Sequence, residues 1–141
     1  MGLGVAMQIA FGPADASPEW SVDATGLFTC LVEDEYGFRL KITIGREGAS
    51  GESQIYLRAL LNGAQVGVSE HTIIDNSRIE IPQTIDTVGD FIAGDTLAFE
   101  IIRDTDGDNS GGLRAGIPDV VGWASSPSAL LAITRTYAIQ T

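Results

Sequence analysis

The stretch Phe38-Arg39-Leu40-Lys41-Ile42-Thr43-Ile44 places an apolar side chain at every second position and a polar one in each gap. Only a strand has this period, because successive side chains of a strand point to opposite faces of its sheet. One face of the segment is therefore wholly branched or aromatic, while the other presents Arg39, Lys41 and Thr43 to water. The pattern predicts a β-strand with one buried face.

Similar segments lie on both sides of this strand. The predicted strands are residues 27–32, 38–44, 54–61, 64–68, 72–74, 78–81, 96–103 and 129–139. Pro82 is expected to end the strand over 78–81, because proline has no backbone N–H to donate to a ladder. Asn62-Gly63 accepts the positive φ angles of a type I′ turn, so residues 64–68 should fold back on 54–61. No segment carries the capping signals and length of a helix.

These strands and their glycine-rich turns predict an all-β fold, a jelly-roll β-sandwich of about eight antiparallel strands. Residues 1–25 are expected to form an N-terminal strand or extended arm followed by a loop that Trp20 anchors, and residues 26–141 the sandwich domain. Residues 104–127 form a long connection with a short apolar piece at 120–123. The residues predicted to face the core are Phe28, Leu40, Ile42, Leu57, Leu97, Phe99, Ile101 and Ile133.

Composition and charge exclude several classes of partner. The chain has 141 residues and a formal charge of −11, with a single lysine, Lys41. Nucleic acid and anionic membranes are not expected partners, since both attract Lys and Arg. No basic residue precedes Arg39, so no secretory leader is predicted, and no apolar run approaches the roughly 20 residues that cross a bilayer. The one cysteine, Cys30, lies in an apolar run and is expected to be a buried thiol.

A weak calcium candidate is formed by Asp104, Asp106 and Asp108, because carboxylates at alternate positions can converge on a hard cation. The segment departs from an EF-hand loop: Asn109 occupies the sixth position, where glycine is needed, and Ala115 the twelfth, where glutamate is needed. A solvated loop without a metal is the preferred interpretation, and no cofactor is predicted.

Catalytic residues are scarce. His71 is the only histidine, and no nucleophile motif surrounds it, so a surface histidine is favoured over a general base. Nineteen acidic residues guarantee accidental carboxylate pairs, so a hydrolase that uses carboxylates alone is an unspecific alternative. We expect no enzyme. Aromatic residues could stack on sugars, but core positions are favoured for the five considered: Trp20, Tyr36, Tyr56, Trp123 and Tyr137.

The N-terminal segment is a candidate for partner binding. Its apolar residues alternate along one face: Val5, Met7, Ile9 and Phe11. Such a strand either pairs within its own domain or adds to the sheet edge of a neighbouring subunit, where it gains main-chain hydrogen bonds and side-chain burial. The sequence leaves both arrangements open.

Two segments carry a family resemblance. Residues 91–101, with a Gly94-Asp95 turn before an alternating aromatic strand, resemble a late strand of the tumour-necrosis-factor and C1q-like jelly rolls, and residues 128–134 resemble their closing strand. Short, acidic, glycine-rich β chains of this kind are also similar to bacteriophage capsid cement or decoration proteins and fibre heads.

The resemblance implies a structural virion protein made in the host cytoplasm. It would bind the outside of a phage capsid as a homodimer or homotrimer and stabilise contacts between major capsid protein subunits. The alternative is the receptor- or glycan-binding head domain of a phage fibre, in which loops such as 104–127 recognise the cell surface.

Overall fold

The computed structural model describes residues 2–12, 17–46, 51–75 and 80–136. These residues form strands and no helix, so none of them builds a helix long and apolar enough to cross a membrane. The strands are β1 (Met7–Gln8), β2 (Trp20–Val22), β3 (Phe28–Cys30), β4 (Asp34–Gly45), β5 (Ser53–Leu61), β6 (Ala64–Ile74), β7 (Glu80–Phe91), β8 (Thr96–Arg103), β9 (Gly112–Leu113) and β10 (Ala129–Arg135).

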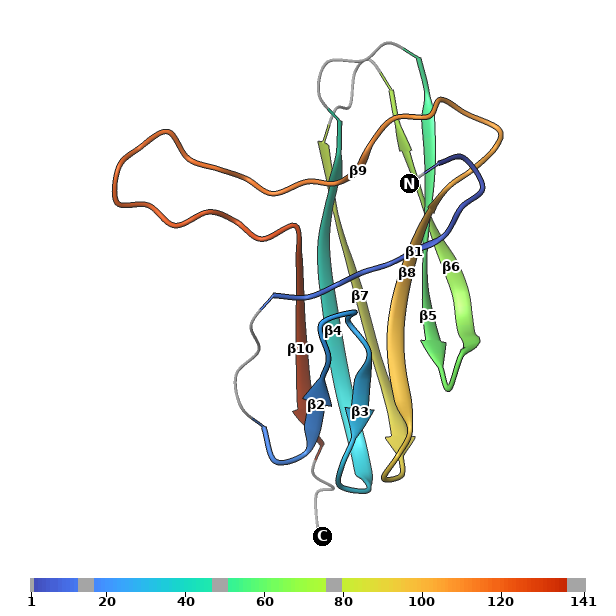
Figure 1. Cartoon of the computed structure of the whole chain (residues 1–141), viewed down its shortest axis with the longest axis vertical. Helices are drawn as coiled ribbons and strands as arrows, with labels where there is room; N and C mark the ends of the chain where they lie inside the picture. Colours follow the sequence, from blue (N-terminus) through green and yellow to red (C-terminus); the bar gives the residue numbers. More distant parts are fainter. Residues whose placement is uncertain (1, 13–16, 47–50, 76–79, 137–141) are drawn as a thin grey trace, which may run out of the picture.

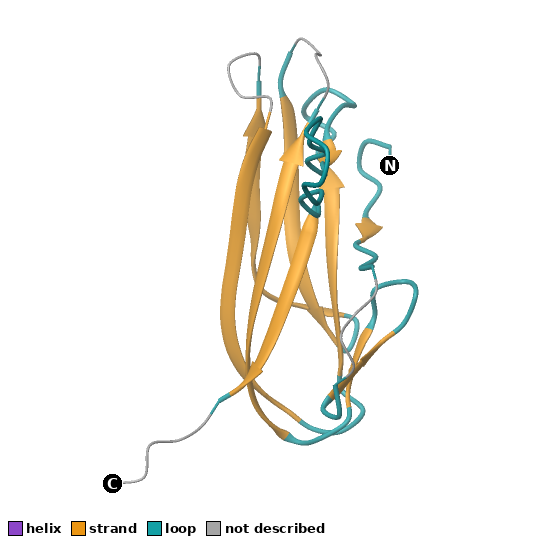
Figure 2. Ribbon diagram, turned by 90° about the vertical axis from the view of Figure 1, so that its left-hand side faces the viewer, coloured by secondary structure: helices purple, strands orange, loops and turns teal. Residues whose placement is uncertain are grey.

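The strands form two antiparallel sheets that pack face to face (Figures 1 and 2). Sheet A has the order β2-β3-β8-β5-β6, and β1 pairs with β8 on the edge that β3 leaves open. Sheet B has the order β10-β4-β7, and β9 pairs with the end of β4 on the same edge as β10. The two longest strands of sheet B, β4 and β7, pair along their whole length.

The strand pairs are nested along the chain. β5 pairs with β6, β4 pairs with β7, and β3 pairs with β8, while successive pairs alternate between the two sheets. A long hairpin folded over in this way is a jelly roll, and β10 then adds to the free edge of β4. Among the described residues, eight strands are at least three residues long. The predicted jelly-roll β-sandwich is confirmed.

Alternating side chains of β4 and β8 form the centre of the core. Leu40, Ile42 and Phe99 are completely buried between the sheets. Seven of the eight residues predicted to face the core are buried, and Ile133, the eighth, packs partly buried against them. On the opposite face of β4, Arg39 and Lys41 are exposed, as the alternation predicted.

The turn between β5 and β6 has the predicted geometry. Asn62 has a φ of 50° and Gly63 a φ of 81°, which is the left-handed pair that a type I′ turn needs. The Asn62 amide also joins this turn to the one before β8: its Nδ2 donates to Asp95 Oδ1 at 2.9 Å, and its Oδ1 accepts from the Thr96 amide at 2.9 Å. Hydrogen bonds therefore connect the Asn62-Gly63 turn to the Gly94-Asp95 turn, and the sequence predicted both turns.

The predicted strand end at Pro82 is wrong, because β7 runs through it to Phe91. Pro82 pairs with Thr43, whose amide and carbonyl both bond to residues on the other side of β4. The backbone of Pro82 therefore faces the open edge of sheet B, where a missing N–H leaves no acceptor unsatisfied. Residues 78–79 of the predicted segment lie outside the described residues, as do residues 137–139 of the last predicted strand.

An aromatic cluster closes the end of the core near β2. Trp20 lies in β2 rather than in a loop, and its ring meets Tyr36 at 5.3 Å and Phe91 at 5.1 Å in edge-to-face contacts. Cys30 is buried beside them, and burial raises the pKa of its thiol. A neutral, enclosed thiol agrees with the sequence-based interpretation of this residue.

Candidate interaction surfaces

Among the described residues, the longest unbroken run of exposed residues is an arm, residues 115–127, that leaves sheet B between β9 and β10 (Figure 1, in orange). Both ends of the arm are tied to one residue of β4. The Arg114 amide donates to the Thr43 carbonyl, and the Thr43 amide donates to the Ser128 carbonyl, each at 2.9 Å. Because both bonds use the same edge of β4, the chain between them projects away from the sandwich as a single excursion.

Within the arm, one antiparallel bridge joins Gly116 to Ser126 through two backbone hydrogen bonds of 3.0 and 2.8 Å. A turn at the tip adds the bond from the Trp123 amide to the Val120 carbonyl. Every residue from 115 to 127 is exposed. The arm therefore has a defined base and tip but buries none of its side chains in its own domain.

The arm carries four large apolar side chains, with exposed fractions of 79% for Ile117, 62% for Val120, 98% for Val121 and 75% for Trp123. A two-stranded hairpin is marginally stable by itself in water, and contiguous exposed apolar groups in a soluble domain mark contact sites. Trp is also the residue type most enriched at the energetic centre of protein interfaces. The arm has the properties of a contact surface for another macromolecule.

The N-terminal segment pairs with its own domain. Met7 and Gln8 pair with Ile101 and Glu100 of β8, and the Ile9 amide donates to the Phe99 carbonyl at 2.8 Å. Ile9 is completely buried, whereas Phe11 is partly buried and contacts Phe28 and Phe99 edge-to-face. Of the four residues predicted to bind a partner, Val5 and Met7 stay substantially exposed. Partner binding through these two residues stays a prediction.

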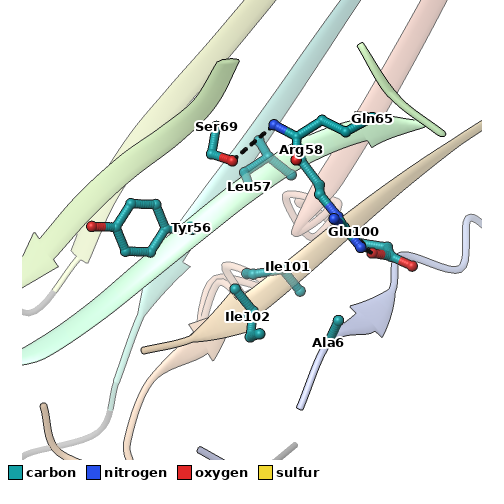
Figure 3. Close-up of a pocket in the computed structure, with 9 residues that line it drawn as sticks. All are labelled: Ala6, Tyr56, Leu57, Arg58, Gln65, Ser69, Glu100, Ile101 and Ile102. Atoms are coloured by element: carbon teal, nitrogen blue, oxygen red, sulfur yellow. Dashed lines mark hydrogen bonds and ion pairs between the residues drawn. The ribbon is translucent and has the colours of Figure 1, made fainter. Parts of the chain in front are cut away.

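A pocket of about 230 Å³ lies on the outer face of sheet A (Figure 3). Strand register builds it from two cross-strand rows: Tyr56 lies opposite Ile102, and Arg58 lies opposite Glu100. Arg58 donates from Nε to Glu100 Oε2 at 2.8 Å and from a second nitrogen to the same oxygen. The residues that line the pocket are Ala6, Tyr56, Leu57, Arg58, Gln65, Ser69, Glu100, Ile101 and Ile102.

An irregularity in β6 forms one wall of this pocket. The register between β5 and β6 shifts between the pairs Leu57–Glu70 and Ala59–Val66, so three residues of β6 lie opposite Arg58 alone. Gly67, with a φ of 69°, provides the left-handed backbone that this bulge requires. Across the bulge, Gln65 Nε2 donates to Ser69 Oγ at 3.0 Å. The bulge thus turns two polar side chains toward the pocket.

His71 stacks on Tyr56 at the end of the pocket, with ring centroids 4.4 Å apart and planes 10° apart, and its Nε2 lies 3.2 Å from Gln54 Oε1. It is an exposed histidine, as expected. Of the other aromatic residues considered for sugar stacking, Trp20 and Tyr36 are buried in the core, whereas Trp123 is exposed on the arm. Tyr137 lies outside the described residues.

The acidic loop after β8 does not gather a metal site. Asp104 Oδ1 accepts from the Asp106 amide at 3.1 Å, and the Asp108 amide donates to the Glu52 carbonyl at 2.8 Å. Within the described ranges, no three His, Cys, Asp or Glu side chains come together in a way that could hold an ion. These contacts fit a turn of the backbone and lend no support to the calcium candidate.

Three arginines surround a second hollow near β9. Arg46 is buried and donates to the Gly51 carbonyl at 2.7 Å, Arg103 donates to the Gly111 carbonyl at 2.6 Å, and Arg114 donates to the Arg46 carbonyl. Each guanidinium therefore bonds to a loop carbonyl at this end of the sandwich. The cluster fastens the loops from which the arm starts.

The sequence assigned the arm a role only in the alternative interpretation, where the connection 104–127 recognises a cell surface, and it assigned none to the pocket. The signal for the arm was present, because residues 117–123 combine branched residues and a tryptophan with glycine and proline and show no strand period. The pocket had no linear signal, since strand register alone brings Arg58 and Glu100 together from positions 42 residues apart.

No family model matches the sequence, and neither does any curated protein. Among solved structures, the chain is similar to a family 35 carbohydrate-binding module from an environmental isolate, with a TM-score of 0.33 and 14% identity. The similarity covers 99% of this chain and 91% of that one. The strand pairing of the chain itself shows the jelly roll.

Proposed function

We propose that this protein is a non-enzymatic structural protein of a virion, which binds the outer surface of a phage capsid as a homo-oligomer and stabilises contacts between major capsid protein subunits. The observation that supports the proposal most directly is the arm, with Val121 98% exposed and Trp123 75% exposed at its tip. A domain that already buries a complete core has no structural need for these side chains on its surface. They become useful when a neighbouring subunit covers them.

The physical logic is that of repeated weak contacts. Burying the apolar surface of the arm contributes roughly 25 cal/mol for each Å² removed from water, part of which offsets the cost of fixing the arm in place. Identical contacts repeated by symmetry over a shell add up, so no single site needs to bind tightly. The open edges of β6 and β7 provide further backbone groups for pairing with a neighbour.

The charge supports an assembly role of this kind. A formal charge of −11 keeps free copies soluble while the arm is exposed, because like charges oppose non-specific association. It also disfavours the packaged nucleic acid as a partner. Assembly would then depend on a complementary partner surface more than on non-specific hydrophobic association.

The test is to mix the purified protein with undecorated shells of the major capsid protein encoded in the same genome and to examine them by electron microscopy. The proposal predicts symmetric, stoichiometric density for the wild type and its loss for the double variant Val121→Ser, Trp123→Ser. Ile92→Ser is the control, because Ile92 is 58% exposed in the turn between β7 and β8, outside the arm. Absent or random density for the wild type would contradict the proposal, and so would equal loss for the control.

A further inference from the structure

We propose that the pocket on the outer face of sheet A binds one neutral sugar ring. This inference goes beyond the proposed assembly function, because the pocket lies on sheet A while the arm leaves from sheet B. Its residues come from β5, β6 and β8 and from the N-terminal segment at Ala6. The apolar residues of the arm and the residues that line the pocket are therefore different.

The volume of the pocket sets the size of the ligand. About 230 Å³ is below the range of roughly 300–1,000 Å³ that accommodates drug-sized molecules. The space suits one six-membered ring with its substituents. In Figure 3 the pocket is bounded by Tyr56 at one end and by Ala6 at the other, with Ile102 between them.

The polar groups of the pocket offer donors and acceptors together. Gln65 uses one N–H on Ser69 Oγ, which leaves its carbonyl oxygen, its second N–H and the Ser69 hydroxyl proton for a ligand. Arg58 directs two nitrogens at one oxygen of Glu100, and no hydrogen bond within the described part of the chain uses the other oxygen, Oε1. A ligand that fits this set must both donate and accept, as sugar hydroxyls do.

The charges favour a neutral ligand. Arg58 and Glu100 form an ion pair, so their charges compensate each other inside the pocket. An acidic sugar would meet Glu100 at short range and would approach a chain with a formal charge of −11. A basic ligand would have to compete with Arg58 for the same carboxylate.

The apolar surface of the pocket suits the C–H face of a sugar. Ile102 contributes an aliphatic side chain, and the Tyr56 ring, which stacks on His71, closes the end of the pocket. The side chains of Leu57 and Ile101, between these outer rows, are buried on the core side of the sheet. A pyranose has one face of C–H bonds and a rim of hydroxyls, so it matches an apolar wall beside a polar one. The bulge of β6 brings these two walls together.

The experiment is an NMR titration of the full chain with D-glucose, D-galactose, D-mannose, N-acetyl-D-glucosamine and D-glucuronate. We expect at least one neutral sugar to shift amides of β5, β6 and β8 around the pocket, with D-glucuronate binding more weakly. The variant Gln65→Ala, Ser69→Ala should bind that sugar about tenfold more weakly or worse, because it loses the polar wall. Both residues are exposed on β6, so the fold should persist, and Thr84→Ala on β7 is the control with wild-type binding.

A second variant tests the choice of a neutral ligand. Glu100→Gln leaves the Arg58 charge without its partner, so binding of D-glucuronate should strengthen relative to the neutral sugar. The inference is overturned if no neutral sugar shifts the pocket amides up to about 50 mM, if shifts appear only elsewhere, or if the wild type prefers D-glucuronate. The arm variant should retain the sugar-induced shifts, so failure of sugar binding and failure of capsid binding are separate results.

Discussion

Strand β4 and the arm are both rich in branched apolar residues, yet their side chains have opposite environments. Leu40, Ile42 and Ile44 of β4 are completely buried, whereas Val121 in the arm is 98% exposed. β4 alternates apolar and polar residues and pairs on both edges. The arm lacks this period and has one internal bridge. Apolar content alone therefore does not decide whether a segment is buried. Burial requires the alternating pattern of a strand and pairing with neighbouring strands, and apolar residues that lack both are available for contact with another molecule.

The largest expected effect on stability comes from a substitution in the core. Phe99→Ala should lower the free energy of unfolding by about 3–5 kcal/mol, because Phe99 is fully buried between the sheets and the neighbours cannot fill the space. Urea denaturation followed by circular dichroism measures the change. Val121→Ala in the arm is the matched change and should alter stability by less than about 0.5 kcal/mol. Similar losses for the two variants would contradict the distinction between them.

The N-terminal segment sharpens the comparison, because the sequence did not decide whether this segment pairs with its own domain or with a neighbouring subunit. Ile9 is completely buried and its amide bonds to β8. We therefore expect Ile9→Ala to cost about 2–5 kcal/mol of stability in the isolated chain. Val5→Ala, at a residue 58% exposed, is the control and should leave thermal unfolding unchanged. Wild-type stability of Ile9→Ala would mean that this segment does not pack on its own domain.

The coupled turns provide an intermediate effect. Asn62→Ala should cost about 1–2 kcal/mol, since it loses two side-chain hydrogen bonds and places alanine at a positive φ. Asn62→Gly removes the same bonds but tolerates the φ angle, so it should lie between alanine and the wild type. Chemical denaturation of the three proteins separates the two contributions. An equal cost for both variants would exclude the backbone contribution.

A smaller, pH-dependent effect is expected at Asp95. Hydrogen bonds from the Asn62 side chain and the Ile92 amide lower the pKa of this carboxyl in the folded chain. A lowered folded pKa means that its stabilising contribution is present above the unfolded pKa and is lost as pH falls through the folded value. The stability difference between wild type and Asp95→Asn should therefore be constant from about pH 5 to 7 and shrink below about pH 4. A difference that does not change with pH would contradict this role.

The parts of the fold that follow from local pattern could be predicted. Strict alternation identified β4, β5 and β8, and Asn62-Gly63 identified the hairpin turn. β7 beyond Pro82 could not be predicted, because an edge strand with one mostly solvated face needs few apolar residues. The pocket depends on the register that sets Arg58 opposite Glu100, and a single sequence does not encode register as a readable pattern.

The same reasoning explains the outcome for the functional residues. Ile9 and Phe11 belong to an apolar alternating segment of the kind that can pair with a neighbouring subunit. Only the tertiary structure shows that they pack against the core of their own domain. Ile117, Val121 and Trp123 have no strand period and lie in a segment that sequence alone describes as a loop. The sequence does not show that these side chains are exposed. Their exposure follows from the structure, in which one edge of β4 bonds to both ends of the arm.

The most direct test of the account is sedimentation velocity on the wild type and on Val121→Ser, Trp123→Ser at matched concentrations. The account predicts that the wild type associates into dimers or trimers and that the variant sediments as a monomer, with a Tm within about 2 °C of the wild type. A monomeric wild type, or a variant that associates as strongly, would contradict the claim that the apolar residues of the arm serve contacts between molecules.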